Sequence, residues 1–281
     1  MCGTCGCGSE ENGVTILSPK ENKANEHHHH HHDGHSHNHS HSHDHDHHHH
    51  DHDHSHDHSH SHDHTHKTVI ALEKDILQHN SVMAARNKGY FEAKNIFALN
   101  LVSSPGSGKT SLLEKTLTDL KNEISFYVIE GDQQTLNDAN RIDALNIPVI
   151  QINTGKGCHL ESDMVYEAVK KLDIKDNSVL MIENVGNLVC PSMFDLGESK
   201  RVVIISTTEG VDKPIKYPDM FHSSDICIIN KIDLLPYVNT DINQLKEYAL
   251  QVNPNLKFFE VSATTGEGMD AWYKWLKENM N

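Results

Sequence analysis

The 281-residue sequence lacks any apolar run near the length of about 18 residues that a membrane-spanning helix needs. Its first residues, MCGTCGCGSE, contain neither a basic nor an apolar segment, so we expect no secretory signal. Basic residues are also few, with 24 Lys and Arg against 40 Asp and Glu and a formal net charge of -16. Phosphate backbones are recognised mainly by cationic side chains. We therefore expect neither a membrane nor a nucleic acid as a partner.

Residues 27–66 lack the apolar residues that could build a core, and they hold 24 of the 27 histidines. Such a segment cannot offset its chain entropy by burial, so it is predicted to be disordered. Neutral imidazoles bind nickel, zinc, copper and cobalt, which indicates a multi-site metal buffer. A solvated or pH-sensitive spacer is the alternative.

Three of the six cysteines, Cys2, Cys5 and Cys7, stand in the first seven residues. The C-x-x-C-x-C spacing with intervening glycines allows a short peptide to surround one ion, and three thiolates suit Ni²⁺ or Zn²⁺. An oxidisable tail without metal is the alternative. Clustered cysteines favour thiolate ligands in a reducing cytosol over disulfides, so we expect a cytoplasmic protein. We interpret residues 1–8 as a metal-binding motif and 9–66 as a disordered linker with the histidine tract.

Residues 67–281 have the length of a single folded domain. Apolar residues at helical spacing in 67–95 predict one or two leading helices that pack on the rest, although a partner-binding role is open. Short apolar runs then alternate with helix-length segments, which predicts an α/β fold with a mostly parallel sheet covered on both faces. In such sheets ligands bind beyond the carboxyl ends of the strands. The predicted strands are 96–102, 126–129, 147–152, 179–182, 202–205, 226–229 and 258–261.

The segment SSPGSGKT, residues 103–110, follows the first predicted strand and precedes a predicted helix. Glycines let backbone N–H groups approach an anion, while Lys109 can reach outer phosphates and Thr110 can bind magnesium. Ser103 occupies a position where the general phosphate-loop template has glycine, and a turn without ligand is the alternative. The pattern predicts a P-loop NTPase. The predicted nucleotide-binding residues here are Pro105, Gly106, Ser107, Gly108, Lys109, Thr110 and Ser111.

Acidic residues follow two other predicted strands. Asp132 in EGDQQT could bind magnesium or orient water, and Glu183 in IENVGN takes the place of the acidic residue in the D-x-x-G element of nucleotide switches. Gly186 takes the place of the glycine in the same D-x-x-G element, whose backbone N–H can contact the terminal phosphate of the nucleotide. We predict Thr110, Asp132 and Glu183 as magnesium ligands. The predicted catalytic residues are Lys109, Asp132 and Glu183.

The segment NKID, residues 230–233, ends the sixth predicted strand. Asp233 can accept hydrogen bonds from both N1–H and the 2-amino group of guanine, a pair that adenine lacks, so this segment indicates GTP. Asn230 and Lys231 are predicted to contact the base. Ser262 and Ala263, after the last strand, are predicted to support it through backbone contacts.

A second set of metal-binding residue types lies inside the domain. Cys158 and His159 occur in TGKGCHLE, and Cys190 occurs in GNLVCPSM, four residues beyond Gly186. If these side chains converge, within one chain or across a dimer axis, metal binding would be linked to the nucleotide state. Two inert cysteines and a surface histidine are the alternative. Lys156 in the same loop is a candidate for crossing a dimer interface, with a solvated lysine as the simpler interpretation.

Together these segments resemble the HypB family, the GTPases that deliver nickel during hydrogenase maturation. The resemblance covers nearly the whole chain. It implies a dimerising P-loop GTPase of the SIMIBI class that binds GTP or GDP with Mg²⁺. The segments are MCGTCGC, the histidine tract, SSPGSGKT, VIEGDQQT, NTGKGCHLE, IENVGNLVCP and NKIDLLPY.

The resemblance also implies metal roles and partners. Cys2, Cys5 and Cys7 would form a high-affinity nickel site, and the second set, Cys158, His159 and Cys190, would bind nickel or zinc. The implied partners are a second copy of the chain, a small zinc-containing maturation protein and the precursor of the [NiFe] hydrogenase large subunit. We expect slow GTP hydrolysis, because no arginine or glutamine has a clear claim to position the attacking water.

Two alternatives are weighed against this interpretation. The related urease accessory GTPases typically have a Cys-Pro-His ligand segment, whereas Cys190 and Pro191 are followed here by Ser192. A nickel storage protein with a structural nucleotide domain would not need Lys109, Thr110 and Asp233. Both observations favour the hydrogenase interpretation.

Overall fold

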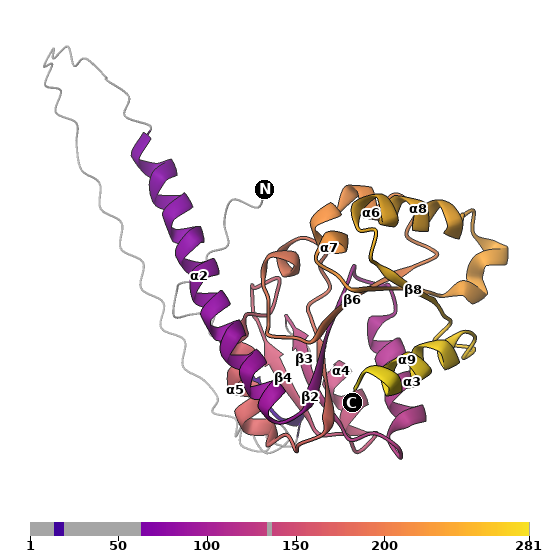
Figure 1. Cartoon of the computed structure of the whole chain (residues 1–281), viewed down its shortest axis with the longest axis horizontal. Helices are drawn as coiled ribbons and strands as arrows, with labels where there is room; N and C mark the ends of the chain where they lie inside the picture. The colour runs from indigo at the N-terminus through magenta and orange to yellow at the C-terminus, as the bar shows by residue number, and fades with distance from the viewer. Residues whose placement is uncertain (1–13, 20–62, 134–136, 281) are drawn as a thin grey trace, which may run out of the picture.

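The computed structural model describes residues 14–19, 63–133 and 137–280, with side chains from residue 73 onward in the second range (Figure 1). The predicted motif of Cys2, Cys5 and Cys7 lies outside these ranges, and so do residues 27–62 of the histidine tract. Their metal-binding roles stay predictions. No helix in the described part of the chain is both long enough and apolar enough to span a membrane.

A single sheet runs through the described residues, with the strand order β1-β4-β3-β5-β2-β6-β7-β8. All neighbouring strands are parallel except β1 and β4. Every strand predicted from the sequence is present, so the mostly parallel sheet is confirmed. The strands are β1 (Thr15–Leu17), β2 (Ile96–Ser103), β3 (Phe126–Asp132), β4 (Val149–Asn153), β5 (Ser178–Glu183), β6 (Lys200–Ser206), β7 (Ile226–Asn230) and β8 (Lys257–Glu260).

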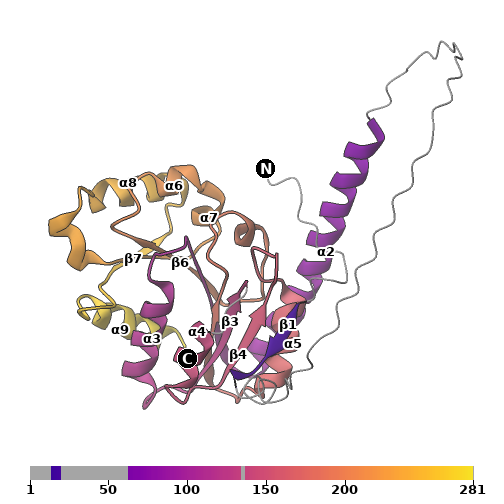
Figure 2. The same cartoon turned by 180° about the vertical axis from the view of Figure 1, so that it is seen from behind.

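Helices cover both faces of this sheet, as predicted (Figures 1 and 2). Successive side chains of a strand point to opposite faces. Leu99 of β2 thus belongs to the core beneath α3, α4 and α9, and Ala98 belongs to the core beneath α2 and α5. The helices are α2 (Asp63–Ala93), α3 (Lys109–Leu120), α4 (Asn137–Asp143), α5 (Ser162–Leu172), α6 (Lys213–Lys216), α7 (Pro218–His222), α8 (Ile242–Val252) and α9 (Met269–Asn279), with 3₁₀ helices η2 (Cys190–Met193) and η3 (Ile232–Tyr237).

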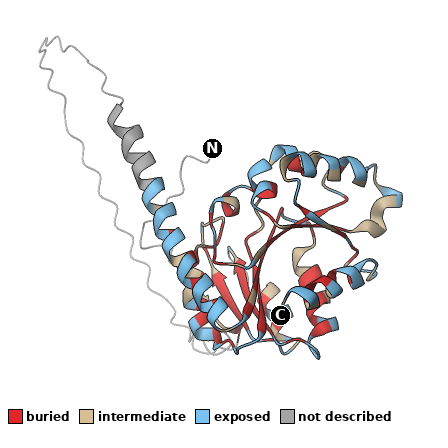
Figure 3. Ribbon diagram, in the orientation of Figure 1, coloured by how far each residue is buried: buried red, intermediate tan, exposed pale blue. Residues whose placement is uncertain are grey.

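The strands are the most buried part of the fold, and the helices expose their outer faces (Figure 3). A third core lies beneath α7 and α8, where Phe221 and Leu245 pack against alternate residues of β6 and β7. Burial on both faces requires near-continuous apolar strands, such as ICIIN in β7. This pattern explains why the strands were readable from sequence.

Two elements correct the predicted disordered linker over 9–66. Thr15–Leu17 forms β1, which pairs with the outer edge of β4 through its backbone. A three-residue strand has too little sequence pattern to be recognised from the sequence. It forms because the free edge of β4 supplies its hydrogen-bonding partners. The leading helix is continuous and begins at Asp63, inside the same range, and it extends beyond the sheet (Figures 1 and 2).

Candidate functional site

The predicted phosphate loop joins β2 to α3 at the carboxyl edge of the sheet. Gly106 and Gly108 have φ angles of 78° and 87°, a region that side-chain-bearing residues rarely adopt. A Cβ atom on Gly108 would stand 2.5 Å from Nδ2 of Asn230. Glycine is therefore required at Gly108 both by its backbone conformation and by the close approach of the NKID segment.

Lys109 and Thr110 begin α3 and both contact Glu183 at the end of β5. Lys109 Nζ and Thr110 Oγ1 each lie 2.6 Å from Glu183 Oε1. The Glu183 side chain is only 1% exposed, so this ion pair is shielded from water. Three residues predicted for phosphate and magnesium binding are thus brought together by two parallel strands that lie side by side.

Carboxylates form a cluster next to the phosphate loop. Oxygen atoms of Glu130, Asp138 and Glu183 lie within 4.8 Å of one another. Glu130 Oε2 and Glu183 Oε2 are buried and accept no hydrogen bond from the described residues. Burial first, and then the nearby Glu183 charge, raise the pKa of Glu130 well above its usual value. Unpaired carboxylate oxygens are the donor type that Mg²⁺ prefers, so the cluster fits this cation.

Sequence reasoning missed Glu130 and Asp138. Glu130 begins the EGDQQT segment from which Asp132 was chosen, so the prediction named only one of the two acidic residues of this segment that lie beside the phosphate loop. Asp132 ends β3 and lines the cavity that the phosphate loop forms with these carboxylates. Its Oδ1 accepts a hydrogen bond from the backbone N–H of Gln133 over 2.7 Å. It is not part of the three-carboxylate cluster. Asp138 lies on α4, where no motif marks it.

The cavity itself has a volume of about 290 Å³. Gly186 lines it from the side of β5, and a Cβ atom on Gly186 would contact Pro105 at 3.5 Å. The predicted phosphate-sensing glycine therefore lies against the phosphate loop. The predicted residues that line the cavity are Pro105, Gly106, Ser107, Gly108, Lys109, Thr110, Ser111, Asp132, Glu183 and Gly186.

The NKID segment approaches the phosphate loop from β7. Asn230 donates from Nδ2 to the Ser107 carbonyl over 3.0 Å and accepts at Oδ1 from the Ala263 N–H over 3.2 Å. Lys231 Nζ donates to the Gly106 carbonyl over 2.6 Å. Asp233 Oδ1 is buried and receives no hydrogen bond from the described residues. The arrangement leaves an acceptor free at the position predicted to bind guanine. Ser262, next to Ala263, is fully buried.

Cys158, His159 and Cys190 converge within a single chain. One ligand-type atom from each lies within 4.8 Å of the others, and Cys158 Sγ is 3.7 Å from His159 Nδ1. His159 and Cys190 are buried, while Cys158 is half-buried. Two sulfurs and an imidazole suit a borderline ion such as Ni²⁺ or Zn²⁺. Lys156, in the same loop, is exposed. No dimer axis is needed for convergence.

Two further residues surround His159 that sequence reasoning missed. The Phe194 ring stacks on the imidazole with centroids 3.9 Å apart and planes at 29°. His159 Nε2 lies 3.5 Å from Glu161 Oε1. Glu161 is in the CHLE segment and could have been noticed. Phe194 could not, since only the packing of the 190–194 segment on the other loop brings it there.

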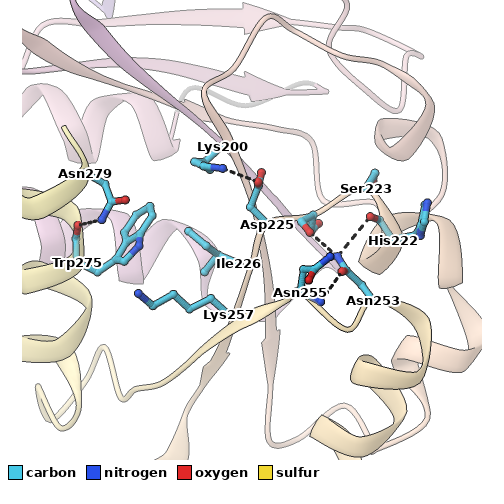
Figure 4. A pocket seen from close by; sticks show the side chains of 11 residues that line it. Lys200, His222, Ser223, Asp225, Ile226, Asn253, Asn255, Lys257, Trp275 and Asn279 are labelled. Atoms are coloured by element: carbon cyan, nitrogen blue, oxygen red, sulfur yellow. Dashed lines mark hydrogen bonds and ion pairs between the residues drawn. The ribbon is translucent and has the colours of Figure 1, made fainter. Parts of the chain in front are cut away.

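A larger hollow of about 580 Å³ lies at the opposite, amino edge of the sheet (Figure 4). Lys200, Ile226 and Lys257, at the beginnings of three parallel strands, line it. Asn253 donates from Nδ2 to the backbone carbonyls of Phe221 and Ser224, over 3.1 and 2.8 Å, and so ties α7 to α8. None of the predicted site residues lines this hollow. The candidate site is therefore the smaller cavity with the adjoining Cys158, His159 and Cys190 cluster.

Comparison with known proteins gives concordant matches. The family model described as the CobW/HypB/UreG nucleotide-binding domain matches residues 97–260. Hydrogenase maturation factor HypB of Rhizobium leguminosarum bv. viciae is 57% identical over 209 residues, which cover 74% of this chain and 70% of that protein. HypB of Escherichia coli strain K12 is 52% identical over 211 residues, covering 75% of this chain and 73% of that protein.

Two solved structures are similar along most of the described chain. HypB from Archaeoglobus fulgidus has a TM-score of 0.68 and 38% identity, covering 73% of this chain and 100% of that one. HypB from Helicobacter pylori in complex with nickel has a TM-score of 0.67 and 39% identity, covering 72% of this chain and 94% of that one.

Proposed function

The chain belongs to the HypB family of hydrogenase maturation factors, and from this premise we propose that it is a GTP-hydrolysing nickel metallochaperone. Its reaction is hydrolysis of GTP to GDP and phosphate, and its cargo is nickel delivered during [NiFe] hydrogenase maturation. Nickel as the cargo is supported by the Helicobacter pylori relative, whose structure is a complex with nickel.

The nucleotide part of the proposal rests on the phosphate loop and NKID. Lys109, which lines the cavity beside the phosphate loop, is proposed to neutralise the outer phosphates, and the buried Asp233 Oδ1 is proposed to accept from the guanine edge. A magnesium ion bound with the nucleotide would neutralise further phosphate charge. Thr110 and Glu183 are its proposed ligands, and Asp132 is a proposed ligand or water-orienting residue beside them.

Hydrolysis by the chain alone is proposed to be slow. Arg141 lines the cavity, but its guanidinium donates to Glu114 over 2.8 Å and to Asp138 over 3.0 Å. A role for Arg141 in phosphate or water positioning would require these bonds to break. Enzymes of this class need a cationic or water-positioning group in the transition state, which a partner or second copy would supply.

Nickel is proposed to bind at Cys158, His159 and Cys190, with zinc as a competing ion of similar preference. GTP would favour a closed dimer, and hydrolysis would relax the segment through Gly186 and change the affinity or accessibility of the three ligands. The N-terminal Cys2, Cys5 and Cys7 are proposed as a high-affinity nickel site, and the histidine tract as a nickel reserve. The proposed partners are a small zinc-containing maturation protein and the hydrogenase large-subunit precursor.

One relationship carries the proposal. Glu183 contacts Lys109 and Thr110, while Cys190 lies seven residues further along the same connection from β5 and stands with Cys158 and His159. A change in the nucleotide pocket therefore has a short physical route to the metal ligands.

Replacing Lys109 tests the function in cells that lack their own copy of the protein. We expect Lys109→Ala to abolish GTP hydrolysis by the purified chain and hydrogenase activity in the cells, with cellular nickel unchanged. Lys115→Ala, on the same helix but paired with Asp119, is the matched control and should retain both activities. A Lys109→Ala strain that matures hydrogenase normally but stores less nickel would overturn the proposal in favour of a storage protein.

A further inference from the structure

The segment 183–187 lies between the phosphate loop and the loop that carries Cys158 and His159, and its residues face these two loops in turn. Glu183 accepts hydrogen bonds from Lys109 and Thr110, and Gly186 packs against Pro105. The two asparagines of the segment contact the other loop instead, as described next.

Asn184 and Asn187 each bond to a backbone group beside a metal-ligand side chain. The Leu160 N–H, directly after His159, donates to Asn184 Oδ1 over 3.1 Å. Asn187 donates from Nδ2 to the Cys158 carbonyl over 3.3 Å. These two bonds hold the peptide groups on either side of His159. They link the 183–187 segment directly to the loop that carries Cys158 and His159, whereas the covalent chain from Glu183 leads to Cys190.

The orientation of the Asn184 amide is determined by a buried chain of polar groups. Glu198 can only accept as a carboxylate, so Asn100 must donate to it from Nδ2, over 3.0 Å. The Asn100 oxygen then accepts from Asn184 Nδ2 over 3.2 Å. This leaves Asn184 Oδ1 directed at Leu160. Both asparagines are fully buried, so water cannot replace either partner.

The same series of hydrogen-bonded polar side chains extends from Glu198 to the other side of the cluster formed by Cys158, His159 and Cys190. Arg201 is buried and donates to Glu198 over 2.9 Å and to the Phe194 carbonyl over 2.8 Å. Phe194 in turn stacks on His159. The polar groups thus hold the backbone after His159 through Asn184 and the backbone of its stacking partner Phe194 through Arg201.

We propose that Asn184, together with Asn187, is a positioning residue that transmits the nucleotide state from Glu183 and Gly186 to the Cys158-His159 pair. The inference rests on the proposed function, since it requires that nucleotide affects the metal site. When the Glu183–Gly186 segment shifts with the bound nucleotide, the two asparagines move the backbone on either side of His159, including the carbonyl group of Cys158. The hydrogen bonds of both asparagine side chains go to backbone groups or to Asn100, and none involves a sulfur or ring nitrogen of the proposed metal ligands.

The reactivity of Cys158 tests this in the full-length chain without relying on metal affinity, which the histidine tract would obscure. The protein is freed of metal, supplied with Mg²⁺ and either GDP or a non-hydrolysable GTP analogue, and treated with iodoacetamide. Alkylation of each cysteine is followed by mass spectrometry of its peptide. Cys227 is fully buried, so it should stay unmodified and report any unfolding.

We expect the wild-type Cys158 alkylation rates in the two nucleotide states to differ by about fivefold or more. Asn184→Ala and Asn187→Ala should reduce this ratio to within about twofold of one. Asn184→Asp keeps the acceptor for Leu160 but replaces the donor to Asn100 with a buried carboxylate oxygen, so it should not restore the ratio. Asn253→Ala also removes an asparagine that bonds backbone carbonyls, but near α7 and α8, and should leave the ratio unchanged.

The possible outcomes are distinguishable. A wild-type difference that persists in both alanine variants overturns the role of the asparagines and leaves the proposed function standing. No difference in the wild type overturns the nucleotide gate itself, and the inference with it. If Asn184→Ala exposes Cys227, Asn187→Ala decides alone, because Asn187 is half-exposed and its removal leaves the core intact.

Discussion

The ring of Phe194 lies on the imidazole of His159, with the two centroids 3.9 Å apart. Phe194 is 6% exposed and His159 is 5% exposed, so the contact excludes water from one face of a proposed metal ligand. The stacking restrains the plane of the histidine ring, in addition to the contact of Nδ1 with Cys158 Sγ over 3.7 Å. It gives an apolar residue a role in a site otherwise made of sulfur and nitrogen.

Replacing Phe194 by leucine should therefore weaken nickel binding at this cluster. Leucine keeps much of the apolar volume but cannot stack, so the imidazole gains rotational freedom that binding must remove. Residues that orient metal ligands typically contribute a factor of about ten in affinity or more. The thiolate-to-nickel absorbance band, with the Cys158→Ser, Cys190→Ser double variant as the blank, measures this loss. An unchanged titration curve would show that the stacking is only packing.

Asp233→Asn should change the base preference from guanine to xanthine. An asparagine amide can donate to the carbonyl that xanthine carries at position 2, whereas guanine has an amino group there. A site built around one hydrogen-bonding pattern rejects the mismatched base by about 10⁴-fold or more. Competition between GTP and XTP for the purified variant checks the switch. Equal loss of both nucleotides would mean that Asp233 supports the fold rather than the base.

Glu130→Gln should stabilise the protein when neither metal nor nucleotide is bound, and more so at higher pH. The folded-state pKa of Glu130 is raised above its usual 4.5, chiefly by burial. Between that value and the raised pKa the unfolded state has lost a proton that the folded state keeps, so wild-type stability falls as pH rises through this window. Glutamine cannot titrate and avoids the loss.

Melting temperatures at about pH 5 and about pH 8 test this expectation, and the variant's advantage should be larger at the higher pH. Addition of Mg²⁺ with a GTP analogue should reverse the order, because the wild type regains the use of a carboxylate next to the cation. A variant that gains as much as the wild type from Mg²⁺ and nucleotide would remove Glu130 from the cation site.

Gly197→Ala should loosen the attachment of α2. Gly197 has a φ of 86°, and a Cβ atom there would stand 2.6 Å from the Ala84 carbonyl and 2.7 Å from Asn87 Cβ. Neither helix backbone nor a buried asparagine can move aside without cost, so we expect a destabilisation of about 2–4 kcal/mol. Calorimetry of the metal-free chain gives this value.

Gly89→Ala is the matched control on the helix itself. Nothing lies within 4 Å of a Cβ atom at Gly89, and alanine favours a helix over glycine, so this change should stabilise the protein by about 0.5–1 kcal/mol. If the free energy of unfolding falls for Gly197→Ala and rises for Gly89→Ala, the loss at Gly197 comes from its contact with α2. A similar loss at both positions would contradict that interpretation.

Much of the fold was determined by the sequence alone, because its signals are local. Strands buried on both faces must be continuously apolar, and the helices between them must be long enough to cross back, so β2 to β8 could be located by pattern. The phosphate loop and NKID were equally readable, since each is a short run of residues whose chemistry can be recognised by itself, although Gly108 must also leave room for Asn230.

The tertiary structure decided which distant residues meet. Leu160 and Asn184 are 24 positions apart, Asn184 and Asn100 are 84 apart, and Asn100 and Glu198 are 98 apart. Their contacts depend on the order of the strands in the sheet and on the crossover connections between them. Composition and motif spacing do not predict the strand order or the crossovers, because many strand orders are compatible with the same alternation of strands and helices along the sequence.

The same reason explains the three places where sequence reasoning was incomplete. Glu130 meets Glu183 because β3 and β5 pair in register at these two residues, and Asp138 joins them because α4 packs over the end of β3. Cys158 and Cys190 meet inside one chain because β4 and β5 flank β3 and end at the same edge, which made a dimer axis unnecessary. Phe194 reaches His159 through the same geometry. Local chemistry named the candidate ligands, and the register of parallel strands determined their neighbours.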